Sequence, residues 1–136
     1  MKVELTVVRA KDVKKPLHPL YSTLRSVQVP HLFFVEPGRD ERQTTFEMPI
    51  AGIHVIGTHI HPHALSIELY NVARKETVWK GMRSSDAAGN SMGVYSSDVG
   101  YPVRAGEVYK VISVYDNPTE APIDAMAGLF IFYSRE

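Results

Sequence analysis

The sequence predicts an all-β domain, either a sandwich or a barrel. Apolar and polar residues alternate with a period of two through most of the chain, and no apolar stripe at helical spacing continues for four turns. Segments rich in Pro, Gly, Asp and Asn separate the alternating stretches, which is typical of short strands joined by turns. The 136 residues suffice to bury one core, so we expect a single domain over residues 1–136.

Eight segments carry the strand pattern. We expect strands at Lys2–Val8, Ser26–Val35, Gln43–Met48, Gly52–His61, His63–Asn71, Glu76–Met82, Glu107–Tyr115 and Asp124–Tyr133. Two prolines break the pattern over residues 10–20, and we expect solvated turns at residues 36–42 and 116–122. Residues 83–102 form the longest weakly patterned segment.

Composition excludes several classes of function. Lys plus Arg and Asp plus Glu both number 15, so the chain lacks the basic excess that nucleic acid binding requires. It has no cysteine, which removes disulfides, thiolate metal sites and a cysteine nucleophile. No apolar run approaches the ~20 residues of a membrane span, and the N-terminal segment does not read as a signal peptide.

Three of the six histidines stand on alternate residues, at His59, His61 and His63. Alternate strand residues face the same side of a sheet, and this parity is apolar in the flanking sequence, so we expect all three on the inward face. Residues two apart lie roughly 6.5 Å from each other, which two rings can bridge through one ion, whereas a spacing of roughly 13 Å is too long. Pro62 favours a strand end, so His59 and His61 form the better pair. The alternative is that these histidines are solvated residues at a loop mouth.

A third ligand must lie upstream or be another residue type, because no histidine follows His63. That absence, and a glutamate placed too far downstream, disfavour a cupin site. Met126 shares parity with Gly128 and Phe130 in the last apolar strand. A methionine there can simply fill the core. Two imidazoles with one thioether would instead suit copper rather than zinc.

The order of these motifs resembles a known family. His59 and His61 in "THIH" and Met126 in "DAMAGLFIFY" resemble the copper-binding domain of ascorbate-dependent monooxygenases of the peptidylglycine and dopamine hydroxylase type. The segments "HIHPHALSIELYN", "AGNSMGVYSSDVGYP", "SVYDN" and "MAGLFIF" are more similar to stress-up-regulated Nod19-like proteins and their bacterial relatives. The resemblance implies an antiparallel jelly-roll β-sandwich, one copper bound by His59, His61 and Met126, and a periplasmic or extracellular location.

Three functions stay open. The first is a copper-binding module for copper handling or for a larger redox protein. The second is an oxygen-activating monooxygenase domain, with O₂ or a small molecule at an open coordination position and a partner redox domain as electron donor. The third is a non-catalytic interaction sandwich without a specific metal. Whether His31, His63 or Asp124 joins the site also stays open; Asp124 is a candidate partner for a ligating imidazole.

Overall fold

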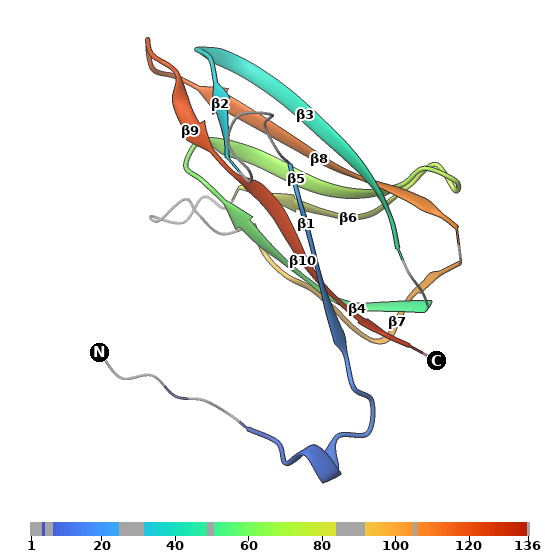
Figure 1. The fold of residues 1–136 in the computed structure, drawn as a ribbon. Helices are drawn as coiled ribbons and strands as arrows, with labels where there is room; N and C mark the ends of the chain where they lie inside the picture. Colours follow the sequence, from blue (N-terminus) through green and yellow to red (C-terminus); the bar gives the residue numbers. More distant parts are fainter. Residues whose placement is uncertain are drawn as a thin grey trace.

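The computed structural model describes residues 4, 7–24, 32–48, 51–83, 92–104 and 106–135, and these residues have the expected all-β fold (Figure 1). One 3₁₀ turn, η1 (Ala10–Asp12), precedes the first strand. The strands are β1 (His18–Thr23), β2 (Phe33–Val35), β3 (Gly38–Glu47), β4 (Ala51–Ile60), β5 (Ala64–Asn71), β6 (Glu76–Met82), β7 (Tyr95–Val103), β8 (Val108–Asn117), β9 (Ile123–Ala125) and β10 (Ala127–Ser134).

Two antiparallel four-stranded sheets face each other. Their strand orders are β1-β10-β4-β7 and β3-β8-β5-β6, and the short strands β2 and β9 pair with each other. From β3 to β4, β4 to β5, β6 to β7 and β7 to β8 the chain crosses from one sheet to the other. This alternation is the strand order of a jelly roll, so the expected antiparallel jelly-roll sandwich is confirmed.

The core lies between the facing sheets, where the buried apolar side chains form one cluster. Ile53 and Ile56 of β4 and Leu129 of β10 are fully buried from one sheet. Ile67 and Leu69 of β5 cover them from the other, and they too are fully buried. The buried residues of β4, β5 and β10 therefore form one core between the two sheets.

Several expected boundaries were wrong. The described part of Lys2–Val8 is not in a strand, and the rest of that segment lies outside the described residues. Strand β1 begins within the segment that prolines were expected to break; it tolerates Pro19 because it is an edge strand. Strand β7 lies within the weakly patterned segment, and residues 39–42, expected as a turn, belong to β3.

A bulge in β4 changes which residues face the core. The register of β4 shifts between Ile53 and Val55 against β7, and it shifts at the same level against β10. After the bulge Ile56 is fully buried, Ile60 packs against the core, and His59 is exposed. The expectation that His59 lies on the inward face is therefore wrong. A sequence pattern cannot reveal the extra residue that reverses its parity.

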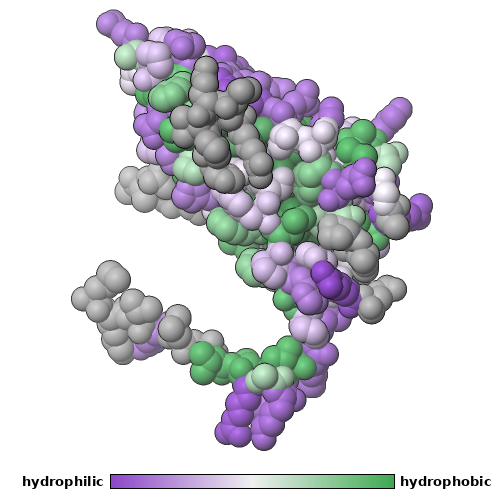
Figure 2. Space-filling view, in the orientation of Figure 1, coloured by the Kyte–Doolittle hydropathy of each residue, from purple (hydrophilic) through white to green (hydrophobic). Residues whose placement is uncertain are grey.

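The segment before β1 projects from the sandwich as an arm (Figure 1). Residues 7–17 are all exposed, including Val7 at 84% and Val8 at 66%. Figure 2 shows hydrophobic residues along this arm, beside a hydrophilic group at its outer bend. No helix in the described part of the chain has the length and hydrophobicity needed to cross a bilayer.

Candidate metal site

The histidine segment and the methionine segment meet at one end of the sandwich. His59 of β4 is paired with Gly128 of β10, and Ile60 is paired with Ala127. Met126 precedes β10 directly, so it lies next to the last residues of β4. Because β4 and β10 are hydrogen-bonded neighbours, residues 67 and 69 positions apart in the sequence lie side by side.

The rings of His59 and His61 lie on the same side of the chain. Their centroids are 5.8 Å apart and their planes meet at 66°. A bound ion would lie roughly 3.2 Å from each ring centroid, so two rings on one ion can be at most about 6.4 Å apart. The observed separation satisfies this limit. His59 is exposed and His61 is half-buried, so solvent reaches the space beside them.

Tyr115 joins the two segments through its hydroxyl. This tyrosine of β8 is fully buried, with its ring edge-on to Phe33. Its oxygen accepts a hydrogen bond from the His61 backbone N–H at 3.2 Å, and its O–H donates to the backbone carbonyl of Met126. One hydroxyl therefore holds the main chain at His61 close to the main chain at Met126. The sequence pattern alone did not identify this role of Tyr115.

Asp124 lies against the His61 ring. Nδ1 of His61 is 3.0 Å from the carboxylate Oδ2 of Asp124 and 3.4 Å from its backbone carbonyl oxygen. A shallow pocket of about 200 Å³ opens here, lined by His61, Pro62, His63, Ile123 and Asp124. Both acceptors on Asp124 face the same ring nitrogen, so Nε2 of His61 is the nitrogen left for an ion.

Of the other described histidines, His63 lines the same pocket as His61, whereas His54 lies in the bulge of β4. His63 lies in the turn after β4 with a φ of 71°, which ends the alternation as Pro62 indicated. His54 is buried, and its ring nitrogens contact the Ser97 carbonyl oxygen at 2.8 Å and the Ser134 hydroxyl at 3.1 Å. His54 is thus fully engaged in the fold. His31 and the "AGN" segment at residues 88–90 lie outside the described residues.

The residues at this end fit copper better than a hard cation. Within the described ranges, no three His, Asp or Glu side chains gather where they could hold an ion. Among the described residues, a third protein ligand would have to be of another type, and the main chain of Met126 lies beside the histidine pair. Two imidazole nitrogens and one thioether sulfur form a donor set suited to copper.

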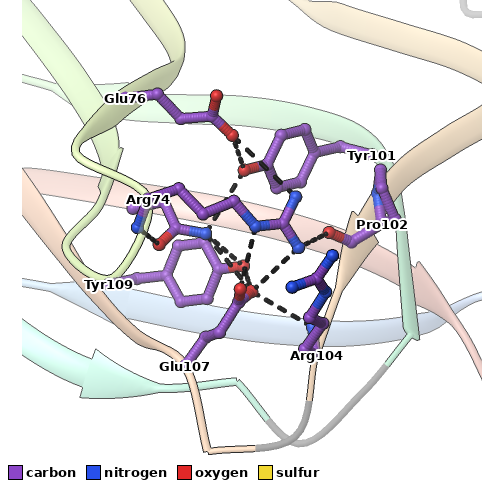
Figure 3. Close-up of polar contacts among 8 residues, drawn as sticks. Arg74, Glu76, Tyr101, Pro102, Arg104, Glu107 and Tyr109 are labelled. Carbon is purple, nitrogen blue, oxygen red and sulfur yellow. Dashed lines mark hydrogen bonds and ion pairs between the residues drawn. The ribbon is translucent and has the colours of Figure 1, made fainter.

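A second polar cluster lies around the β5–β6 turn, at the other end of β5 from the histidine pair, and Figure 3 shows its contacts. Arg74, in the β5–β6 turn, donates from Nε to Glu107 Oε1 at 2.8 Å and from Nη2 to the Pro102 carbonyl at 2.8 Å. The fully buried Tyr109 donates to Glu107 Oε2 at 2.9 Å. Asn71 donates to the Tyr109 hydroxyl at 3.1 Å. Each polar group has a partner, so this cluster joins strand ends rather than offering a binding site.

Electrostatics agree with a structural role for this cluster. Burial alone would raise the pKa of Glu107, but the Arg104 backbone N–H, the Arg74 guanidinium and the Tyr109 hydroxyl stabilise its charge and lower its pKa to about 2. Burial, together with the neighbouring Glu107 charge, raises the pKa of Tyr109. The carboxylate and the phenol therefore both keep their ordinary forms at neutral pH.

Comparison of the chain with models of known protein families and with curated proteins found no match. The resemblance seen in the motifs therefore stays a prediction.

Proposed function

We propose that this protein binds one copper ion through His59, His61 and Met126. The observation that carries the proposal is the 5.8 Å separation of the two imidazole rings beside the strand that follows Met126. The Tyr115 hydroxyl supports it, because it ties the His61 and Met126 main chains together. Two ligand segments from distant parts of the sequence are thereby kept in a fixed relation, as a mononuclear site requires.

Copper is proposed because of the donor set. Imidazole binds both oxidation states of copper, and a thioether favours Cu(I). A copper ion with three protein ligands supplies one-electron redox chemistry and free coordination positions. The exposure of His59 gives solvent and small molecules a path to such an ion. We assign the site to copper handling or to a module of a larger redox protein, since an oxygenase role needs a separate electron donor.

The deciding experiment measures copper content after loading the purified protein, together with the electron paramagnetic resonance spectrum of the Cu(II) form. We expect one tightly held copper per chain and a spectrum with nitrogen ligands. His59→Ala and His61→Ala should abolish tight binding, and His63→Ala, a matched change at the same end, should keep it. Loss in the His63 variant alone would refute the assigned ligand pair.

Thermal unfolding separates the proposal from an interaction sandwich without a specific metal. An ion that binds only the folded state stabilises it by about 2.7 kcal/mol at a free concentration 100-fold above Kd. For a chain of this length that corresponds to a rise in Tm of roughly 9 °C. An unchanged Tm in both the parent and the His59→Ala protein, at saturating copper, would favour the metal-free function.

A further inference from the structure

We propose that Asp124 is a positioning residue, which keeps the proton of the neutral His61 ring on Nδ1 and turns Nε2 toward the site. The expected effect of Asp124 on copper affinity rests on the function proposed above. The expected effect on the tautomer of His61 in the metal-free protein does not, so the two expectations can fail separately.

The geometry of the contact fixes the tautomer. The carboxylate Oδ2 of Asp124 lies 3.0 Å from Nδ1 of His61, and the backbone carbonyl oxygen of Asp124 lies 3.4 Å from the same nitrogen. The carboxylate is nearer, whereas the carbonyl is better aligned with the N–H direction. Both oxygens only accept hydrogen bonds when the carboxylate is ionised. Whichever of them is used, Nδ1 must carry the proton and Nε2 must carry the lone pair.

The fold holds both partners of this contact in place. Asp124 is the middle residue of β9 and is paired with Phe34, and the next residue, Ala125, is fully buried. The turn before β9 is fixed by the buried Asn117, whose amide donates to the carbonyls of Val35 at 3.0 Å and Ala121 at 2.9 Å. On the other side, the His61 main chain is bound to the Tyr115 hydroxyl.

This arrangement matters because a free neutral histidine favours the proton on Nε2, which is the wrong nitrogen for this site. A metal-binding histidine commonly donates its other ring N–H to a carboxylate or a carbonyl, which sets the ring orientation and makes the ligating nitrogen more basic. In this chain one residue offers both acceptors. The exposed carboxylate supplies the charge, and the backbone carbonyl supplies a second acceptor on strand β9.

The first test needs no metal. Long-range ¹H–¹⁵N correlation spectra of the metal-free protein, recorded about two pH units above the usual pKa of histidine, distinguish the two tautomers of His61. We expect the Nδ1–H form in the parent protein and a shift toward the Nε2–H form in Asp124→Ala. Asp116→Ala, which removes an exposed aspartate at the end of β8, should leave the His61 signals unchanged. An Nε2–H form in the parent protein would overturn the proposal.

The second test measures Cu(II) affinity by competition with a chelator of known affinity. Asp124→Ala should weaken binding by about 10- to 100-fold, while Asp116→Ala should stay within about twofold of the parent. Parent-like affinity in Asp124→Ala would overturn the role of the carboxylate. If the parent protein binds no copper, the proposed function fails, and the tautomer spectra still decide whether Asp124 orients His61.

Discussion

Tyr115 shows how one side chain can set the geometry of a site that it does not enter. Burial raises the pKa of its phenol to about 12, so the hydroxyl stays protonated and can donate at any ordinary pH. The hydroxyl accepts a hydrogen bond from the His61 N–H and donates one to the Met126 carbonyl. The hydroxyl therefore provides hydrogen-bond partners for the His61 N–H and the Met126 carbonyl, which lie just outside β4 and β10.

Removing this hydroxyl should affect both stability and copper affinity. Tyr115→Phe leaves the His61 N–H and the Met126 carbonyl without their partner, at a cost of about 1–3 kcal/mol in the free energy of unfolding. Copper affinity should fall about 10-fold because the two segments are no longer tied. Tyr109→Phe is the matched control, since Tyr109 is equally buried at the opposite end. Urea denaturation and chelator competition measure the two effects, and equal copper affinities in the two variants would contradict the argument.

Met126 is expected to discriminate between the oxidation states of copper. Met126→Ala should weaken Cu(I) binding at least about 10-fold more than Cu(II) binding, because the thioether is the soft ligand. Competition titrations with Cu(I)- and Cu(II)-specific chelators measure the two affinities. Met82→Ala, at an exposed methionine of β6, should change neither affinity. Equal losses for both oxidation states would show that Met126 acts through packing alone.

For single residues, the sequence indicated which side chains are candidate ligands, but it did not identify the side chains that hold those ligands in place. The alternation of His59 and His61 predicted that the two rings share a side, and their rings are neighbours. The contact between His61 and Asp124 was one of several open possibilities in the sequence. Tyr115 could not be predicted, because a tyrosine whose hydroxyl fills a hydrogen-bonding position has the same strand pattern as one that only packs.

Strand β4 owes its shape to a bulge that is filled by a buried histidine. The His54 ring lies in contact with Gly100 of β7, which has a φ of +85°. A Cβ added at Gly100 would lie 2.8 Å from Cε1 and 2.9 Å from Nε2 of His54. The neighbouring strand therefore needs glycine at this position both for its backbone angle and for the space that the ring occupies.

Comparing Gly100→Ala with Gly106→Ala separates the effect of the positive φ from the effect of contact with the His54 ring. Gly106 also has a positive φ, of +76°, but a Cβ there would meet nothing within 4 Å. We expect Gly106→Ala to cost about 1–2 kcal/mol from backbone strain and Gly100→Ala to cost about 3 kcal/mol or more, because the His54 ring must also move. Chemical denaturation measures both. Equal losses would mean that the ring moves without resistance.

The elements that the sequence predicted well are those whose alternation is unbroken. Strand β6 (Glu76–Met82) has the bounds that were expected, and β5 and β8 differ only at their ends. Strands β1 and β7 were missed because each contains a proline, at Pro19 and Pro102, that is tolerated at the edge of a sheet. Whether a strand will be an edge strand depends on the tertiary topology, which short-range patterns do not contain.

The two ends of the sandwich have different roles. One end carries the candidate metal site, and at the other end the Arg74–Glu107 cluster joins the strand ends. The jelly-roll order produces this separation, because the β4–β5 connection and the β5–β6 turn lie at opposite ends of β5. Substitutions in the cluster should therefore change global stability without changing copper affinity.

Acid unfolding tests the contribution of Glu107 to the whole molecule. Its pKa of about 2 in the folded chain lies below the ordinary value of 4.5, so its stabilisation is complete above that value and is lost as the pH falls from about 4.5 through about 2. Glu107→Gln should lower the free energy of unfolding by about 2–4 kcal/mol at neutral pH and flatten its dependence on pH in this window.

Glu76→Gln is the matched control for this experiment. Glu76 belongs to the same cluster but is exposed, so its substitution should keep the acid dependence of the parent protein. Urea denaturation at a series of pH values measures the free energies. A Glu107→Gln protein with the full parental loss of stability in acid would show that other carboxylates cause it.

The position of β10 has a consequence for how the protein is made. The last strand of the chain lies between β1 and β4, so one of the two sheets has no continuous ladder until residues 127–134 are available. A ribosome-bound chain that lacks this segment can form hairpins such as β5–β6, but it cannot bring β1 to β4. The proposed copper site, which needs Met126 beside β4, can therefore be assembled only once residues 127–134 have paired with β4.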